Sequence, residues 1–288
     1  MVSLIDRSIA ARLPAALRKP MSFAALVVVV VVCATAMLAP WLTALDPNAM
    51  NLNAVLQPPS WQHWAGTDEL GRDQLTRILH GARPSVAAAL GIVAIGAVFG
   101  LTIGALSGLL AGWVDTVTMR LTDVVMALPG LVVALALTAA LGPSLFNAVV
   151  ALGLLSIPAY VRVARGQALA LREREYVLAA RAMGANTRHL LVRHIVPGVL
   201  PPVLVFMTFH LGSAVLASSA LSFIGLGAQP PAAEWGSMIG AGRPYVLGHW
   251  WLVTLPGVVV IATAASFNLI GDALRDWLDP RSGASGSR

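Results

Sequence analysis

Charged residues are scarce in this sequence, and their scarcity excludes most soluble folds. Only 11% of the 288 residues are charged, whereas 57% are hydrophobic and the mean hydropathy is +0.78. A water-soluble chain of this length needs a more polar surface. Because a chain in lipid must satisfy its backbone hydrogen bonds internally, the composition predicts an all-α integral membrane protein built as one helical bundle.

Cysteine and lysine each occur once, which excludes several kinds of site. Cys33 lies inside the first apolar stretch, so we expect no disulfide framework and no cysteine-based metal site. Lys19 is the only lysine and lies beside that stretch, so the chain lacks a Walker A loop, whose lysine reaches the phosphates of ATP. Despite a net charge of +6, no basic run is interleaved with aromatic residues, and we expect no nucleic-acid partner.

Five long stretches contain no Asp, Glu, Lys or Arg. They lie between Lys19 and Asp46, Arg83 and Asp115, Asp123 and Arg162, His194 and Glu234, and Arg243 and Asp272. The third is long enough for two spans of about 18 residues, separated by a turn at Gly142 and Pro143. The sequence therefore predicts six transmembrane helices.

The basic residues predict the orientation of these helices, because short cytoplasmic loops retain Lys and Arg. With the N-terminus inside, all but four of the 19 basic residues are cytoplasmic; the exceptions are Arg72, Arg77, Arg83 and Arg243. The predicted order is a cytoplasmic N-terminus (1–20), a first transmembrane helix (21–45), an external loop with an interfacial helix (46–83), a core with five transmembrane helices (84–272) and a cytoplasmic tail (273–288). The first apolar stretch is too long for a signal peptide, so we expect an uncleaved anchor.

The uncharged spans bear on the class of function. A carrier driven by protons or cations usually keeps ionisable side chains within its spans, and here only His210 and His249 lie inside or beside one. Ser213 and its neighbouring serines lie near His210, but no Gly-x-Ser-x-Gly elbow accompanies them. An ion-coupled carrier and a membrane enzyme are therefore the less favoured alternatives.

The predicted cytoplasmic loop at 162–197 is long, basic and rich in helix-forming residues. Strong helix formers dominate residues 166–183, Gly184 provides a helix end, and Asn186 or Thr187 can cap a second short helix. Pro197 is expected to end that helix before the next span. The pattern predicts a helix, a turn and a helix; an interfacial hairpin that binds anionic lipid is the alternative.

The segment before the second span predicts a short helix at the outer membrane surface. Thr67 is its expected N-cap, and Gly81 with Pro84 is expected to separate it from the span. Asp68, Arg72 and Asp73 alternate in sign, which favours a local charge network. The alternative is a simple surface helix with no such network.

Three segments carry a resemblance to a known family. Ala179, Ala180 and Gly184, followed by residues 195–197, resemble the Glu-Ala-Ala loop of ABC importer permeases, although Leu178, His194 and Val196 depart from its pattern. GTDELGRDQLTRILHGARPS (66–85) and LSFIGLGAQPPAAEWGSMI (221–239) resemble the C-type permease of dipeptide and oligopeptide ABC importers, whose nickel-importing members share these motifs. The resemblance covers nearly the whole chain.

The resemblance implies a type I, MetI-like permease that carries peptides, with nickel, glutathione or another small solute as alternatives. It implies a homologous second permease, cytoplasmic ATP-binding subunits that hold ATP and Mg²⁺, and an extracytoplasmic substrate-binding protein, with no cofactor on this chain. The implied coupling residues are Glu175, Tyr176, Ala179, Ala180, Arg181, Gly184, Ala185, Arg188 and Pro197. The implied external motif is Gly66, Thr67, Asp68, Gly71, Arg72 and Asp73.

Overall fold

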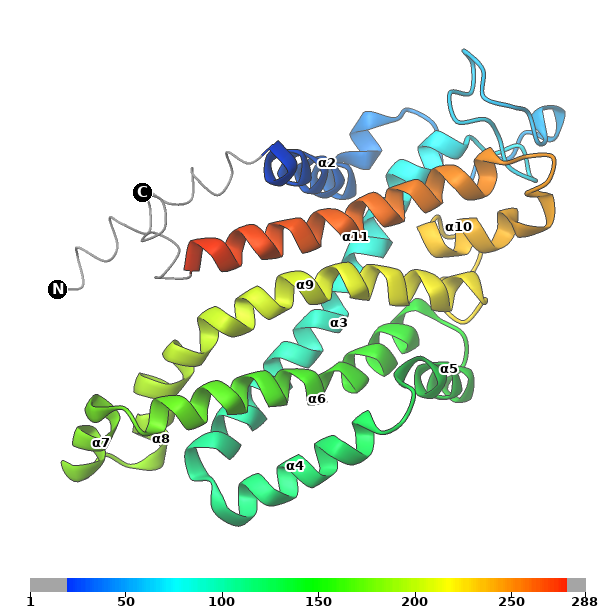
Figure 1. Ribbon diagram of the computed structural model, residues 1–288. Helices are drawn as coiled ribbons and strands as arrows, with labels where there is room; N and C mark the ends of the chain where they lie inside the picture. The colour runs from blue at the N-terminus through cyan, green and yellow to red at the C-terminus, as the bar shows by residue number, and fades with distance from the viewer. Residues whose placement is uncertain (1–19, 279–288) are drawn as a thin grey trace.

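The computed structural model describes residues 20–278, and this part of the chain is built from helices (Figure 1). The long helices are α2 (Pro20–Leu42), α3 (Gln74–Leu110), α6 (Leu145–Arg172), α9 (Val196–Phe223) and α11 (Trp251–Leu278). The shorter ones are α4 (Gly112–Met126), α5 (Gly130–Leu141), α7 (Glu175–Ala182), α8 (Thr187–Leu190) and α10 (Trp235–Gly242), with 3₁₀ turns at Leu52–Ala54 and Arg243–Tyr245 and a π-helical turn at Leu191–Ile195. The predictions for 1–19 and 279–288 lie outside the described residues.

The six predicted spans correspond to the five long helices and one broken pair. Each long helix is apolar enough to cross a membrane, and α4 with α5 forms a sixth candidate that is bent by 83°. The predicted turn at Gly142 and Pro143 is confirmed between α5 and α6. The span before that turn is not one straight helix, because the chain breaks at 127–129, where Pro129 has no N–H and disfavours a helical conformation at Leu128.

A second correction concerns the start of α3. Gly81 and Pro84 were expected to separate a short surface helix from the second span, but α3 runs unbroken through both residues. Gly81 is a packing position, since a Cβ there would lie 2.9 Å from Cδ1 of Trp235. Neighbouring helices allow a proline inside a membrane helix, so Pro84 does not end this one. The external segment and the second span are therefore joined rigidly.

The most extensive contact between helices within residues 20–278 is that of α3 with α6. Four glycines at intervals of four residues form one face of α3, and they lie against Tyr160, Val161, Ala164 and Ala168 of α6: Gly96, Gly100, Gly104 and Gly108. Small residues at this spacing let helix backbones approach closely in a membrane. Figure 1 shows α6, α9 and α11 side by side, with α3 crossing behind them.

The two ends of this bundle carry different structures (Figure 1). At one end lie the segment 46–73 and α10, and we call this the Asp68 end. At the other lie α7 and α8, within the Gly184 loop, which comprises residues 173–195. The predicted external motif and the predicted coupling residues therefore lie at opposite ends of the molecule.

Candidate functional site

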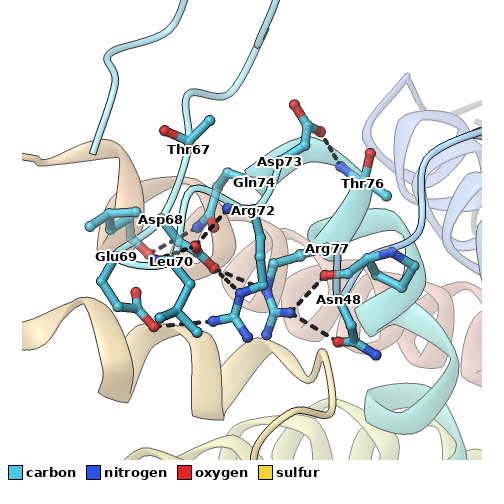
Figure 2. Close-up of polar contacts among 12 residues, drawn as sticks. Asn48, Thr67, Asp68, Glu69, Leu70, Arg72, Asp73, Gln74, Thr76 and Arg77 are labelled. Atoms are coloured by element: carbon cyan, nitrogen blue, oxygen red, sulfur yellow. Dashed lines mark hydrogen bonds and ion pairs between the residues drawn. The ribbon is translucent and has the colours of Figure 1, made fainter. Parts of the chain in front are cut away.

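Asp68 is the centre of a buried charge cluster at the Asp68 end (Figure 2). Its Oδ2 accepts a hydrogen bond from Nε of Arg72 at 2.6 Å and lies 3.5 Å from Nε of Arg77. Its Oδ1 accepts from the backbone N–H groups of Leu70 and Arg72 at 3.0 and 2.9 Å. Asp68, Arg72 and Arg77 are at most 5% exposed. Buried charges are tolerated when they are paired in this way.

The two arginines tie the cluster to the preceding chain. Arg72 also donates to Glu69 at 3.1 Å, and Arg77 donates to the carbonyl of Pro47 at 2.9 Å and to Oδ1 of Asn48 at 3.3 Å. The predicted network of Asp68 and Arg72 is confirmed, whereas the prediction omitted Arg77. The sequence does contain a signal for Arg77, because an acidic residue is twice followed four positions later by an arginine: Asp68 by Arg72, and Asp73 by Arg77.

Asp73 does not belong to the predicted charge network and instead takes the capping role that the sequence predicted for Thr67. Asp73 caps α3, because its Oδ1 accepts from the backbone N–H of Thr76 at 2.8 Å, and its Oδ2 lies 2.9 Å from Nδ1 of His63. Thr67 is not the N-cap: its hydroxyl donates to the Ala54 carbonyl and accepts from the Gln57 N–H. The helix starts later than expected, since the chain first makes a turn at residues 68–71.

Two glycines of the predicted external motif lie just before that turn and at its end. Gly66 and Gly71 have φ values of +73° and +70°, which favour glycine. A Cβ at Gly71 would also overlap the carbonyl group of Asn51. Both glycines are therefore required by the backbone.

Glu234 fastens α10 to α3, and the sequence prediction did not include it. This fully buried carboxylate caps α10 by accepting from the N–H groups of Gly236 and Ser237 at 3.0 and 2.8 Å. Ser85 of α3 donates its hydroxyl to Glu234 at 3.3 Å. Burial raises the pKa of Glu234 above its usual 4.5, while these hydrogen bonds favour the ionised form. A single Glu in an apolar stretch was the only signal available.

Aromatic and amide side chains form further hydrogen bonds between the elements at the Asp68 end. The indole N–H groups of Trp235 and Trp251 donate to the carbonyls of Ile78 and Thr67 at 2.9 and 3.2 Å. Gln74 of α3 donates to the carbonyl of Leu252 at 3.2 Å. A pocket of about 210 Å³ remains between the charge cluster and α10. The segment 46–73, α3, α10 and α11 form one block here.

The Gly184 loop confirms the predicted helix, turn and short helix, with different limits. The first helix does not run through residues 166–183, because α6 continues to Arg172 and α7 starts anew at Glu175. Pro197 does not end the second helix, since α8 continues through the π-helical turn into α9. Pro197 cannot donate a backbone hydrogen bond to the preceding turn, and the helix accommodates it with the wider π-helical turn directly before it.

The predicted turn at Gly184 is confirmed. Gly184 has φ of +87°, and the N–H groups of Gly184 and Ala185 bond back to the carbonyls of Arg181 and Ala180, both at 3.0 Å. This pattern is a common way to end a helix. Asn186 caps α8 by accepting from the N–H of His189 at 2.8 Å, as one of the two predicted caps.

The loop turns most of the predicted coupling residues outward. Exposed are Glu175, Tyr176, Ala179, Arg181, Gly184, Arg188 and Pro197, while Ala185 is half-buried and Ala180 is buried. Tyr176 and Met183 are 50% and 83% exposed, which is unusual for apolar side chains. A pocket of about 560 Å³ between α7 and α8 is lined by Tyr176, Gly184, His189 and His194, among others. The loop presents an apolar, basic surface with a hollow.

Comparison with known proteins identifies the family. Residues 100–283 match the sequence profile described as "Binding-protein-dependent transport system inner membrane component". The chain belongs to this family. This membership confirms the prediction that the chain is an ABC importer permease. Like the rest of its family, it is a membrane component with several apolar helices.

Curated permeases resemble the chain over most of their length. The probable D,D-dipeptide transport system permease protein DdpC of Escherichia coli is 48% identical over 93% of this chain and 90% of its own length. The di/tripeptide transport system permease protein DppC of Pseudomonas aeruginosa is 42% identical over 85% and 83%. The glutathione transport system permease protein GsiD of Pectobacterium atrosepticum is 40% identical over 92% and 88%.

A solved structure supports the fold of this permease. A chain of the MetNI methionine ABC transporter in an inward-facing conformation superposes with a TM-score of 0.56 at 20% identity. The match covers 70% of this chain and 97% of that chain. The predicted type I, MetI-like permease fold is thereby confirmed.

Proposed function

We propose that this permease carries short peptides into the cell as the membrane-spanning subunit of an ABC importer. The identity of 48% to a D,D-dipeptide permease, over 93% of this chain, supports the proposal most directly. The similarity to a di/tripeptide permease agrees with it. The similarity to a glutathione permease at 40% identity favours glutathione, itself a modified tripeptide, as the second candidate.

The proposal assigns a partner to each end of the bundle. Since basic residues concentrate at the Gly184 loop and in both terminal segments, we place these on the cytoplasmic side of a bacterial membrane. ATP-binding subunits with ATP and Mg²⁺ would contact the loop, and a substrate-binding protein would dock at the Asp68 end. A homologous second permease would close the path, and this chain would bind no nucleotide.

The Gly184 loop has the form that such a contact needs. Exposed Tyr176, Leu178 and Met183 give it an apolar surface, which favours insertion into a groove of a partner. Buried Val177, Leu190 and Ile195 fasten it to the ends of α6 and α9. A displacement of the loop would therefore tilt these two spans, as alternating access requires.

Gly184→Trp tests this function. A large side chain at the turn adds bulk to the docking surface, and Gly184 has no atoms within 4 Å of its Cβ position, so the fold can accept it apart from backbone strain. We expect the variant to lose dipeptide uptake at least about tenfold, equivalent to about 1.4 kcal/mol, and to copurify with less ATP-binding subunit. Gly166→Trp adds the same bulk at an equally unobstructed position of α6, without the positive φ, and is the control for bulk alone.

Two outcomes would overturn the proposal. If the purified permease never retains an ATP-binding subunit, the ABC assignment of this loop fails. If Gly184→Trp transports dipeptides at the rate of Gly166→Trp, the loop does not couple transport to the ATP-binding subunits.

A further inference from the structure

The exposed face of α11 changes from apolar to polar along its length. Six exposed residues recur every three or four positions, and so lie on one face: Thr254, Val258, Ile261, Ala265, Asn268 and Asp272. Val258 and Ile261 are apolar and more than half exposed, as expected beside lipid. Asn268 lies on the same face, within the uncharged stretch that ends at Asp272. An amide within a span that faces hydrocarbon would leave its hydrogen-bonding groups unsatisfied.

Polar side chains of α9 lie at the same level. A Cβ at Gly212 would lie 2.6 Å from the carbonyl oxygen of Ala264 and 3.0 Å from Oδ1 of Asn268, so Asn268 packs beside this turn of α9. His210 and the exposed Ser213 flank Gly212. Nδ1 of His210 lies 2.9 Å from the hydroxyl of Tyr160 on α6, which leaves Nε2 on the opposite side of the ring for another partner.

A groove lies next along this surface toward the Gly184 loop, and it carries two further polar residues. It measures about 730 Å³, and its lining from α6, α9 and α11 is mostly apolar, Phe206 included, with Gln167 and Arg275 as its polar residues. Arg275 follows Asn268 by seven residues, and Ser213 follows Phe206 by seven, so each pair shares one helix face. Gln167 and Arg275 are exposed. The polar groups therefore lie along one surface, from within the spans to the mouth of the groove.

We propose that this surface, formed by Gln167, His210, Ser213, Asn268 and Arg275, is the wall of the solute path in this permease. The inference rests on the proposed function and adds where on this chain the solute binds. Carboxamide side chains donate and accept hydrogen bonds, as the backbone of a short peptide requires, and a guanidinium at the mouth binds a carboxylate. Polar groups that face away from the protein within spans typically mark such paths.

Cysteine labelling tests the assignment in the assembled transporter. In a Cys33→Ser background, we introduce Ser213→Cys or Asn268→Cys and treat membranes with a charged, membrane-impermeant methanethiosulfonate. Val30→Cys is the control, since Val30 is 57% exposed on the peripheral helix α2. Because a thiol in apolar surroundings does not ionise readily, we expect both path positions to react at least about tenfold faster than Val30→Cys. An excess of dipeptide should slow the labelling of both path positions.

The second measurement is dipeptide uptake by transporters that carry one of two substitutions at Asn268. Asn268→Gln keeps the carboxamide, whereas Asn268→Leu removes it at similar volume. We expect Asn268→Leu to lower dipeptide uptake about tenfold, as the loss of one hydrogen bond to the solute predicts, and Asn268→Gln to retain most of it. Copurification of the ATP-binding subunit shows whether both variants assemble.

The results separate this inference from the proposed function. Labelling at both positions no faster than at Val30→Cys, while the transporter takes up dipeptide, overturns the path assignment alone. Crosslinking of Ser213→Cys to the second permease without reagent access also overturns it, since the surface is then a subunit contact. Fast labelling without uptake of any peptide supports the path and contradicts the peptide substrate.

Discussion

The Asp68 end and the Gly184 loop are held together by different kinds of contact. At the Asp68 end, hydrogen bonds join residues far apart in the sequence, such as Gln74 with Leu252 and Trp235 with Ile78. Within the Gly184 loop, the hydrogen bonds described above join residues at most five positions apart. The first end is therefore fixed before any partner binds. The second relies on local structure and leaves apolar side chains exposed for a partner.

Asp68→Asn tests the fixed end and should have the largest effect. The substitution removes the carboxylate that pairs with two buried arginines, and breaking a buried pair costs about 3–5 kcal/mol. We expect a clear drop in the melting temperature of the purified permease in detergent. Asp123→Asn is the control, because its pair with Arg162 is about half exposed on both sides and contributes about 0–1 kcal/mol. If both variants lowered the melting temperature equally, the buried pairs of Asp68 would not hold the Asp68 end more firmly than a surface pair does.

Alanine at two glycines compares the two ends directly. Both Gly71 and Gly184 have positive φ, so each substitution carries backbone strain of about 1–2 kcal/mol. Only at Gly71 does the new Cβ overlap a backbone carbonyl, which adds about 1–3 kcal/mol of overpacking. Gly71→Ala should therefore lower the melting temperature more than Gly184→Ala. If the order is reversed, the Asp68 end is not the more rigid one.

Glu234→Gln probes the buried carboxylate through pH and should have a smaller effect. Because burial raises the pKa of Glu234 in the folded state, its contribution to stability is complete below the unfolded pKa and is lost as pH rises through the folded pKa. Glutamine does not titrate. Measured from pH 4.5 upward, the melting temperature of the variant should rise relative to that of the natural protein. A constant difference would show that burial does not shift this group.

Tyr176→Ala should have the smallest effect on stability. The side chain is half exposed on the Gly184 loop, and such substitutions usually change stability by less than about 0.5 kcal/mol. If the loop docks on an ATP-binding subunit, however, dipeptide uptake should fall while the melting temperature stays the same. If the variant had a clearly lower melting temperature, Tyr176 would stabilise the fold of the permease and would not act mainly as a contact for the ATP-binding subunit.

The sequence predicted features that depend on local composition, and it missed those that depend on distant partners. Uncharged stretches located the spans, and Gly184 marked a turn because its need for positive φ is a local property. Glu234 was missed because its partner Ser85 lies 149 positions away in the chain. Thr67 was a reasonable cap by type, but the turn before Asp73 was visible only in three dimensions. The break at Pro129 depends on how its neighbours pack, because proline is often tolerated inside membrane helices.

The glycine face of α3 has a mechanical consequence. This helix has 37 residues, about 55 Å at 1.5 Å per residue, so it is longer than the membrane is thick. Its first turn is built into the block at the Asp68 end, and its glycines lie against α6, whose last turn meets the Gly184 loop. If the loop moves with an ATP-binding subunit as proposed, the close packing of α3 on α6 would carry that movement along α3 to the Asp68 end.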